Sequence, residues 1–137
     1  MTYACACTAL RKASRAVTRR YDEALSPHGL TTVQFAILRT LSRLGETPLS
    51  PLAEEMVMDR TSLYRTLKPM AAAGWIAVGD GAGRTKLAVL TPQGAALLEK
   101  AVPDWRRTQA EFEARMGPPT WAALQAGITA ALNAVQS

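Results

Sequence analysis

A run of hydrogen-bond donors and cations lies along one side of a helix predicted over residues 60–68. The residues with groups suited to an anionic or polar partner are Arg60, Thr61, Ser62, Tyr64, Arg65 and Lys68. Leu63, Leu67 and Met70 recur at helical spacing on the opposite side. Guanidinium, ammonium and hydroxyl groups match phosphate oxygens and base edges, so the pattern predicts contact with nucleic acid. A solvated helix face is the alternative interpretation of the same residues.

Two short helices around a turn would position this side. Ser50 as N-cap and Pro51 at the first helical position predict the start of a supporting helix. Asp59 is placed to cap the next helix, which presents the cations and is predicted to end at Gly74. Pro69 lies inside that second helix, where its ring and missing N–H predict a distorted last turn. Together they predict a helix-turn-helix with residues 60–68 as its recognition helix.

A short β-hairpin is predicted directly after these helices. Residues 75–78 and 84–90 are compatible with strands, and the glycine-rich run 79–83 between them permits the positive φ angles of a hairpin. This wing-like hairpin carries Arg84 and Lys86. A supporting helix on one side and a wing on the other favour DNA contact over a solvated face for residues 60–68.

Two helices are predicted before this segment. Apolar positions recur at helical spacing from residue 3 to 25, while most arginines of that stretch lie off the apolar stripe. The run Thr31-x-x-Gln34 forms a capping box and predicts a second helix that ends at Gly45. The first helix is therefore amphipathic and needs a partner for its apolar side.

Two more helices are predicted after the hairpin. Thr91 and Pro92 form an N-cap and first-turn pair that opens a long helix, with Pro103 expected to kink it. Gly117 ends this helix, and Thr120 is expected to cap a last one that extends to about residue 135.

Length, composition and charge restrict the class of protein. At 137 residues the chain is expected to be one domain. Its net charge of +5 and pI near 9.7 favour a polyanionic partner if the cations cluster. Neither a membrane-spanning run nor a secretory signal is evident, so we expect a cytoplasmic protein without membrane contact. Two cysteines do not form a disulfide framework.

The predicted order α-α-α-α-β-β-α-α indicates a fold class that is mainly α with a small β-hairpin wing. Residues 30–97 are predicted to form a winged helix-turn-helix that binds DNA, within a single domain of residues 1–137. The helices of residues 1–29 and 98–137 keep apolar stripes that this small core does not cover. A homodimer would bury those stripes and set two recognition helices one or more DNA turns apart.

Several short motifs, in this order and spacing, resemble the MarR (multiple antibiotic resistance regulator) family of bacterial winged-helix repressors. They are Gly29-Leu30-Thr31-x-x-Gln34-Phe35-x-Ile37-Leu38, Leu52-Ala53-x-x-Met56, Arg60-Thr61-x-Leu63-x-Arg65-x-Leu67, Gly74-Trp75-Ile76, and Asp80 with Arg84 and Leu90-Thr91-Pro92-x-Gly94. The resemblance covers nearly the whole chain. It implies an obligate dimer on a pseudo-palindromic operator in double-stranded DNA.

The resemblance also implies that the protein represses nearby genes until a small phenolic or other apolar anion, or an oxidant, releases it. In such proteins a wing arginine enters the minor groove, and Arg84 matches it. Family wings typically carry more cations than Arg84 and Lys86, so minor-groove contact is expected to be weaker here.

The two cysteines raise a second hypothesis. On a helix Cys5 and Cys7 point about 200° apart, which disfavours a shared metal. Cys7 falls on the apolar stripe and is interpreted as a small buried side chain. The alternative is a thiol-based peroxide sensor, because the run from Cys7 to Tyr21 resembles the first helix of organic-hydroperoxide regulators, with Cys7 as sensing thiol and Tyr21 supporting it. A second supporting tyrosine of those proteins falls on Thr32.

Aromatic residues of the last two helices permit a small-molecule effector site. Trp105, Phe112, Met116 and Trp121 are interpreted as core or interface residues, or alternatively as the lining of a ligand cavity. Arg11 and Arg15 are either solvated or placed to balance a ligand carboxylate.

Enzymatic activity is not expected. The sequence contains no nucleophile elbow, phosphate loop or zinc motif, so no catalytic residue, cofactor or metal ligand is predicted. The alternatives from other classes are a thiol peroxidase that uses Cys7 and a winged-helix module that binds proteins instead of DNA.

Overall fold

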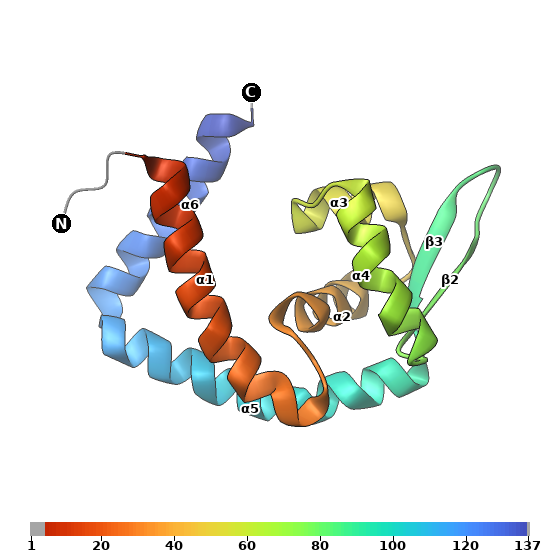
Figure 1. The fold of residues 1–137 in the computed structure, drawn as a ribbon, viewed down its shortest axis with the longest axis horizontal. Helices are drawn as coiled ribbons and strands as arrows, with labels where there is room; N and C mark the ends of the chain where they lie inside the picture. Colours follow the sequence, from red (N-terminus) through yellow and green to blue (C-terminus); the bar gives the residue numbers. More distant parts are fainter. Residues whose placement is uncertain (1–4, 137) are drawn as a thin grey trace.

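The computed structural model describes residues 5–136 and consists of helices around a small sheet (Figure 1). In chain order the elements are α1 (Ala6–Leu25), the 3₁₀ turn η1 (Ser26–His28), α2 (Thr32–Leu44), β1 (Thr47–Pro48), α3 (Leu49–Met56), α4 (Arg60–Ala72), β2 (Ile76–Asp80), β3 (Lys86–Leu90), α5 (Pro92–Met116) and α6 (Pro118–Val135). The predicted class, mainly α with a β-hairpin wing, is confirmed.

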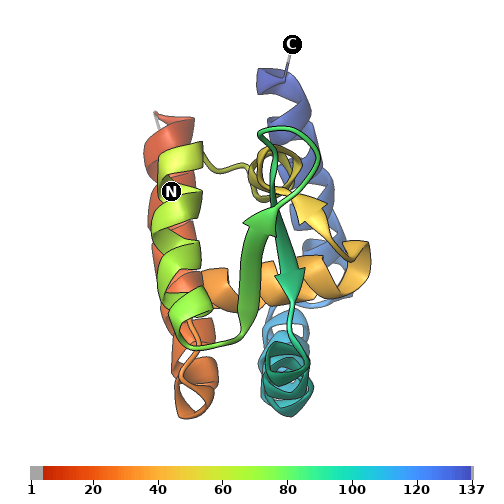
Figure 2. The same ribbon diagram turned by 90° about the vertical axis from the view of Figure 1, so that its right-hand side faces the viewer.

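The long helix α5 connects two parts of the molecule (Figure 1). Its first turns lie below α2, α4 and the hairpin, and its last turns lie beside α1 and lead into α6. Viewed from the hairpin end, α1 and α4 lie on one side of the molecule and α5 and α6 on the other (Figure 2). No helix in the described part of the chain is long and apolar enough to cross a membrane.

The sheet has three antiparallel strands in the order β1-β3-β2 (Figure 2). In the hairpin Ile76 pairs with Leu90 and Asp80 with Lys86, so the loop consists of residues 81–85. The predicted strands differ from the observed ones by one or two residues at three of their four ends, and the predicted end of the second strand at Leu90 is confirmed. The strand β1 was not predicted, because a two-residue strand that pairs with a distant segment leaves no periodic pattern in the sequence.

Local capping signals fix most helix starts. Thr31 accepts from the Gln34 amide at 3.2 Å and Gln34 accepts from the Thr31 amide at 3.0 Å, which confirms the capping box. Thr91 caps α5 as predicted, accepting from the Gly94 amide at 3.0 Å. The Thr91 hydroxyl also donates to the Gly74 carbonyl at 2.6 Å and so connects the start of α5 to the turn that follows α4.

Two predicted caps are wrong. The helix α3 begins at Leu49 with Pro48 as N-cap, so Ser50 lies inside the first turn. The helix α6 begins at Pro118 after Gly117, and Thr120 lies inside it. Pro118 occupies the first helical position of α6, where its preset φ suits the helix and its missing N–H needs no acceptor, so this helix begins ahead of Thr120. The first predicted helix differs at Cys5, which is the N-cap of α1 and not part of the helix; residues 3–4 of the prediction lie outside the described chain.

The core lies in the winged-helix part. Its most deeply buried side chains come from α2, α3, α4 and the end of α1 and include Leu25, Ile37, Leu38, Leu52, Leu63 and Met70. Phe35 stacks on Trp105 of α5, with ring centroids 5.7 Å apart, and so joins α5 to this core. The helix α6, by contrast, has no buried residue.

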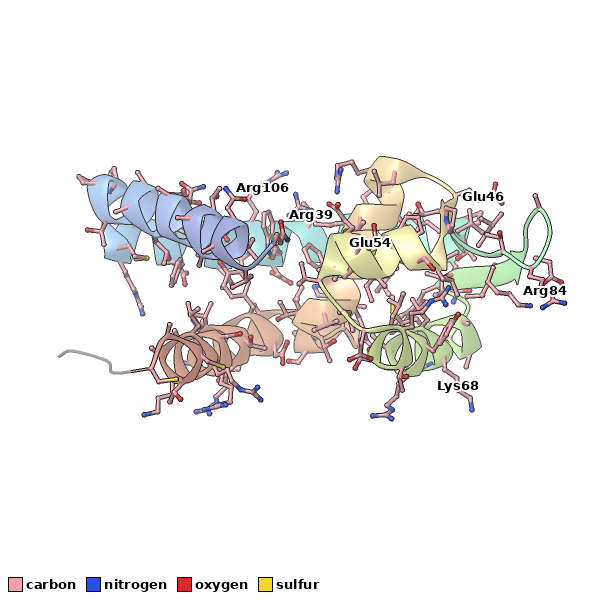
Figure 3. The ribbon with its side chains drawn as sticks, turned by 90° about the horizontal axis from the view of Figure 1, so that it is seen from above. Arg39, Glu46, Glu54, Lys68, Arg84 and Arg106 are labelled. Atoms are coloured by element: carbon pink, nitrogen blue, oxygen red, sulfur yellow. The ribbon has the colours of Figure 1, made fainter. Side chains whose placement is uncertain are left out.

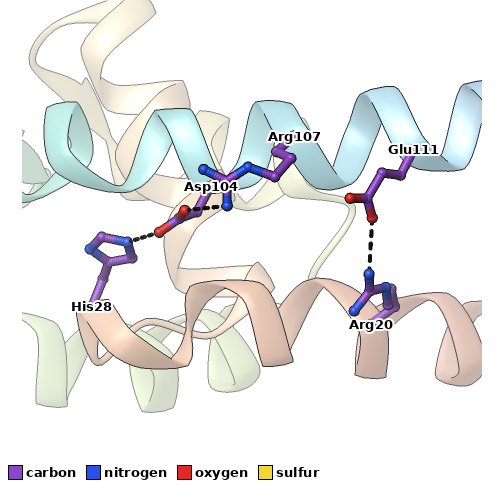
Figure 4. A network of polar contacts seen from close by, with 5 residues as sticks. All are labelled: Arg20, His28, Asp104, Arg107 and Glu111. Carbon is purple, nitrogen blue, oxygen red and sulfur yellow. Dashed lines mark hydrogen bonds and ion pairs between the residues drawn. The ribbon is translucent and has the colours of Figure 1, made fainter.

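Polar contacts fasten α1 and η1 onto α5 (Figure 4). His28 Nε2 lies 2.6 Å from Asp104 Oδ2, and Arg107 donates to the other carboxylate oxygen at 3.1 Å. The hydrogen bond with His28 lowers the pKa of Asp104, with the Arg107 charge contributing. Arg20 and Glu111 pair farther along at 2.9 Å. These contacts join α1 and η1 to the middle of α5.

Candidate nucleic-acid interface

The two sides of α4 separate as the sequence predicts. Leu63, Leu67 and Met70 are almost completely buried against the core. On the other side five of the predicted contact residues are exposed, namely Arg60, Thr61, Tyr64, Arg65 and Lys68, while Ser62 is half-buried. Figure 3 shows Lys68 directed away from the body of the protein. The donor-bearing side of α4 is therefore bare in a single copy of the chain.

The start of α4 is held by Asp59. Its carboxylate accepts from the Ser62 amide at 2.7 Å and from the Ser62 hydroxyl at 2.9 Å. These hydrogen bonds lower the pKa of Asp59 and keep it ionised. The Ser62 hydroxyl is thus committed to the cap as a donor, and only its lone pairs remain for another partner.

A contact that the sequence analysis missed positions Arg60. The guanidinium donates to the Ser50 hydroxyl at 2.5 Å, so α3 supports the first cation of α4. The helix α3 begins two residues earlier than predicted, so Ser50 lies in its first turn, where its hydroxyl accepts from Arg60. The i,i+10 spacing of the two residues gives no sequence signal for this contact.

The two wing cations differ in their surroundings. Lys86 donates to Asp80 at 2.6 Å, and the two residues face each other in the hairpin register. This pairing raises the pKa of Lys86 and lowers that of Asp80. Arg84 projects from the loop at the end of the wing (Figure 3) and makes no ion pair with residues 5–136. Arg84 is therefore the wing cation that is available to a phosphate.

A cleft of about 490 Å³ brings the helix and the wing together. Four predicted contact residues line it, namely Arg60, Tyr64, Arg84 and Lys86, together with the start of α3. Thr61, Arg65 and Lys68 lie on the exposed side of α4 outside this cleft. The arrangement offers a cationic concave surface between two protruding elements, which suits a phosphate backbone that passes between adjacent grooves.

Comparison with known proteins identifies the fold. Residues 30–78 match the sequence model of the MarR family. The HTH-type transcriptional repressor Rv2887 of Mycobacterium tuberculosis is 33% identical over 98 residues, which are 70% of this chain and 70% of that repressor. The chain belongs to the MarR family.

Solved structures agree with this assignment to the MarR family. The M. tuberculosis transcriptional regulator MosR, crystallised with DNA, is 39% identical, with a TM-score of 0.84 over 97% of this chain and 99% of MosR. Bordetella bronchiseptica BpsR, whose DNA binding is regulated by 6-hydroxynicotinic acid, is 21% identical and shares the fold at a TM-score of 0.85 over 97% of this chain and 99% of BpsR. This MarR-family protein is a DNA-binding transcriptional regulator.

One MarR-family relative is matched less completely. The uncharacterized regulator YwoH of Bacillus subtilis is 26% identical over 85 residues, and the chain spans 62% of its length.

The structure corrects the interpretation of Cys7 as a buried side chain. Both Cys5 and Cys7 are exposed in this MarR-family chain. Cys5 is the N-cap of α1, and hydrogen bonds with Thr8 lower the pKa of its thiol. Tyr21 is buried and donates to Gln109 at 2.5 Å, and burial raises its pKa. Cys7 and Tyr21 lie about 21 Å apart along α1, so one protomer does not bring them together.

The aromatic residues proposed as a ligand-cavity lining do gather around a cavity. Trp105, Phe112 and Trp121 line a space of about 410 Å³ between α1, α5 and α6. Met116 is not among its lining residues. Arg11 and Arg15 are also not among its lining residues; they line an adjoining depression on α1 that shares Leu10 and Ser14 with this cavity. The wall is apolar apart from hydroxyl groups, of which Tyr21 and Thr32 are two.

Proposed function

We propose that this protein is a homodimeric repressor that recognises a pseudo-palindromic operator with α4 in the major groove and Arg84 in the minor groove. The proposed DNA contacts are Arg60, Thr61, Ser62, Tyr64, Arg65, Lys68, Arg84 and Lys86. Residues 30–97 form the DNA-binding part, and residues 1–29 and 98–137 contribute the dimerisation helices. The observation that carries this proposal is the bare donor side of α4 beside a cationic cleft at the wing.

Exposed apolar side chains on the outer helices, α1 and α6, support a dimer. On α1 and α6 the side chains of Leu10, Ile128 and Leu132 are 52%, 45% and 41% exposed. Residues 116–136 carry no charged side chain, so water is a poor partner for α6 over its whole length. A second copy that covers α6 removes this apolar surface from water and places two recognition helices on one duplex.

DNA selection from a random pool, followed by titration of the selected duplex, tests the proposal. Affinity should fall steeply with salt, with a log–log slope of several units for about 6–10 phosphate contacts. Arg65→Ala is expected to reduce the preference for the operator over random DNA. Lys68→Ala is expected to weaken binding to both duplexes to a similar degree. If both substitutions act equally on operator and random DNA, the base-reading role of Arg65 is wrong.

We further propose that a small molecule with an apolar body releases the repressor. The cavity lined by Trp105, Phe112 and Trp121 lies between the dimerisation helices and is large enough for an aromatic ring. Its hydroxyl groups suit a phenol. Titration of the protein–operator complex with phenol and with cyclohexane carboxamide tests this, and only the phenol is expected to lower operator occupancy.

The exposure of Cys7 favours a second candidate trigger, which is an oxidant. Cys7 and Cys5 are both exposed near the start of α1, which satisfies the access requirement for peroxide chemistry, and the pKa of the neighbouring Cys5 thiol is lowered by Thr8. Within one protomer Tyr21 is hydrogen-bonded to Gln109 and lies about 21 Å from Cys7 along α1, so this candidate rests on the thiol alone. Thiol titration and operator binding before and after peroxide, in the wild type and in Cys7→Ser, test it. Equal binding in all four conditions rules out a thiol trigger.

A further inference from the structure

A row of four cations lies along the exposed side of α1. Its members, which form no ion pair with any residue from 5 to 136, are Arg11, Lys12, Arg15 and Arg19. At about 100° of rotation per residue, these four positions fall within one arc of about 100° around the helix. Along the helix axis the row is about 12 Å long. We call this surface the α1 cation row. None of its residues belongs to the DNA interface proposed above.

No carboxylate offsets the charge of this row. Residues 5–20 contain five cations and no acid. Of these cations only Arg20 is paired, with Glu23 of the same helix and with Glu111 of α5. Asp22 accepts two hydrogen bonds from α2, at 2.7 and 2.6 Å. The acids of α1 are therefore engaged elsewhere, and the α1 cation row presents charge of a single sign to solvent.

The apolar side of α1 is a different surface from the cation row. Leu10, Val17 and Tyr21 line the cavity between α1, α5 and α6. Their mean direction on the helix is about 150° from that of the row. In the proposed dimer the second copy covers apolar side chains of α1, so the cations on the opposite side remain open to another partner.

The α1 cation row and the recognition helix face the same side of the molecule. Figure 2 shows α1 and α4 on one side and α5 and α6 on the other. In Figure 3 side-chain nitrogens of α1 are directed to the same side as Lys68, whereas Arg106 lies on the opposite side. A two-fold axis that sets both copies of α4 on one duplex also carries both cation rows to that side.

The place of α1 in the dimer indicates which part of the duplex the row meets. In the proposed dimer α1 and α6 form the contact with the second copy, so α1 lies nearer the two-fold axis than α4 does. The winged-helix part lies at the other end of α5 (Figure 1). The two cation rows therefore lie over the DNA between the two half-sites.

We propose that the α1 cation row binds the phosphate backbone at the centre of the operator, between the sites that α4 contacts. Phosphate contacts of this kind add affinity without reading the base sequence. The side chains next to the row, Thr8 and Ala16, are small, so the surface lacks the aromatic or large apolar anchor that a protein partner needs. Duplex DNA on the same side of the molecule supplies the opposite charge. This inference rests on the proposed function.

Salt titration of the complex with the selected duplex tests the charge contribution. The double variant Arg15→Gln/Arg19→Gln removes four row cations from a dimer, and each phosphate contact contributes about 0.9 unit to the log–log slope. We expect the slope to fall by about 2–4 units. Affinity for operator and random DNA should fall by a similar factor, at least about tenfold at low salt, because phosphates carry no sequence information.

A matched variant controls for the change in net charge. Lys100 and Arg106 of α5 are exposed and form no ion pair with any described residue of the chain. The double variant Lys100→Gln/Arg106→Gln therefore removes the same charge from another surface. Its slope should stay within about 0.5 unit of the wild-type slope, because charges beyond the Debye length are screened. An equal fall of the slope in both double variants would overturn the proposal.

Uncharged linkages in the DNA locate the contact. Methylphosphonates replace an equal number of phosphates either between the two half-sites or outside them. Central replacement should weaken wild-type binding at least about fivefold and binding of Arg15→Gln/Arg19→Gln less than about twofold. Outer replacement should affect both proteins equally, and Arg15→Lys/Arg19→Lys should respond like the wild type. An equal response of the wild type and the Gln double variant to central replacement contradicts the proposal.

Two further results separate this contact from the rest of the account. If the wild type binds the selected duplex but Arg15→Gln/Arg19→Gln keeps its affinity and slope, the central contact is wrong and the docking of α4 stands. The central contact is also wrong if this variant sediments as a monomer, because the row would then serve the contact with the second copy. If the wild type binds no duplex from the random pool, the docking of α4 is itself refuted, and the central contact with it.

Discussion

The winged-helix part and the outer helices of this chain bury their apolar side chains to very different degrees. In α2 five residues are buried, among them Ile37 and Leu38, which have no exposed surface. In α6, a longer helix with a higher apolar content, none is buried. The winged-helix part therefore completes its core within one chain. The outer helices α1 and α6 leave apolar side chains uncovered in one chain, and in the proposed dimer a second copy covers them. If so, folding and dimerisation depend on different residues.

The largest effect is expected in the winged-helix core. Leu38→Ala removes a fully buried side chain and should lower the free energy of unfolding by about 3 kcal/mol, within a range of roughly 2–5 kcal/mol. Thermal melts monitored by circular dichroism would show a drop of roughly 10 °C. This loss of stability in Leu38→Ala should be the same at every protein concentration. A loss of less than about 1 kcal/mol would show that the core of this part is not complete in one chain.

Substitutions in the outer helices α1 and α6 should instead change the dimer dissociation constant. Leu132→Asp on α6 is expected to raise the dimer dissociation constant at least about 100-fold, because it leaves an unpaired charge in the interface. Analytical ultracentrifugation measures this directly. Val78→Asp is the matched control, because Val78 is 40% exposed on the wing and Leu132 is 41% exposed. If both variants stay dimeric, α6 is not the interface.

A smaller effect is expected at the turn between α3 and α4. Val57 adopts a left-handed conformation with φ of +51°, which is unfavourable for a β-branched residue. Its side chain is 68% exposed, so little packing is lost on removal. Val57→Gly should raise the free energy of unfolding by about 0.5–1 kcal/mol, and Val57→Ala by less. Destabilisation by Val57→Gly in urea titration would contradict this account of the turn.

The smallest effect concerns the charge of the α4 cap. Hydrogen bonds from Ser62 lower the pKa of Asp59 below the ordinary value of 3.8. A carboxyl whose pKa is lower in the folded state stabilises above the unfolded value and loses that stabilisation as pH falls through the folded value. The melting temperature of the wild type should therefore exceed that of Asp59→Ser from neutral pH to about pH 5, and the difference should shrink below pH 3.8. A difference that does not change down to pH 2 would show that the Asp59 charge has no role.

The features that the sequence predicted are those encoded by neighbouring residues. The Thr31–Gln34 capping box, the Asp59 cap and the two sides of α4 depend on spacings of three or four residues, which the helix itself fixes. The starts of α3 and α6 were misplaced. At α6 the preset φ of Pro118 at the first helical position outweighs the capping preference of Thr120. At α3 Pro48 ends the strand β1 and serves as N-cap, so Ser50 falls inside the helix.

Features that depend on pairing across the chain were not predictable in the same way. The strand β1 exists only because β3 is beside it, and the neutralisation of Lys86 by Asp80 depends on the hairpin register. The Arg39 stack on Trp105 joins residues of α2 and α5 that are far apart in sequence. A single sequence carries no signal for such contacts, because it contains no information on which distant surfaces meet.

Hydroxyl-radical footprinting of the full-length protein on its selected duplex tests the central claim most directly. Two copies that each present the bare side of α4 should protect two equivalent half-sites on one face of the DNA. The centres of these half-sites should lie about 10 base pairs, or a multiple of that, apart. Arg84→Ala should remove the flanking minor-groove protection and leave the central pattern in place. A single protected patch without two-fold symmetry would contradict the account. So would the absence of protection at concentrations at which the protein is fully dimeric.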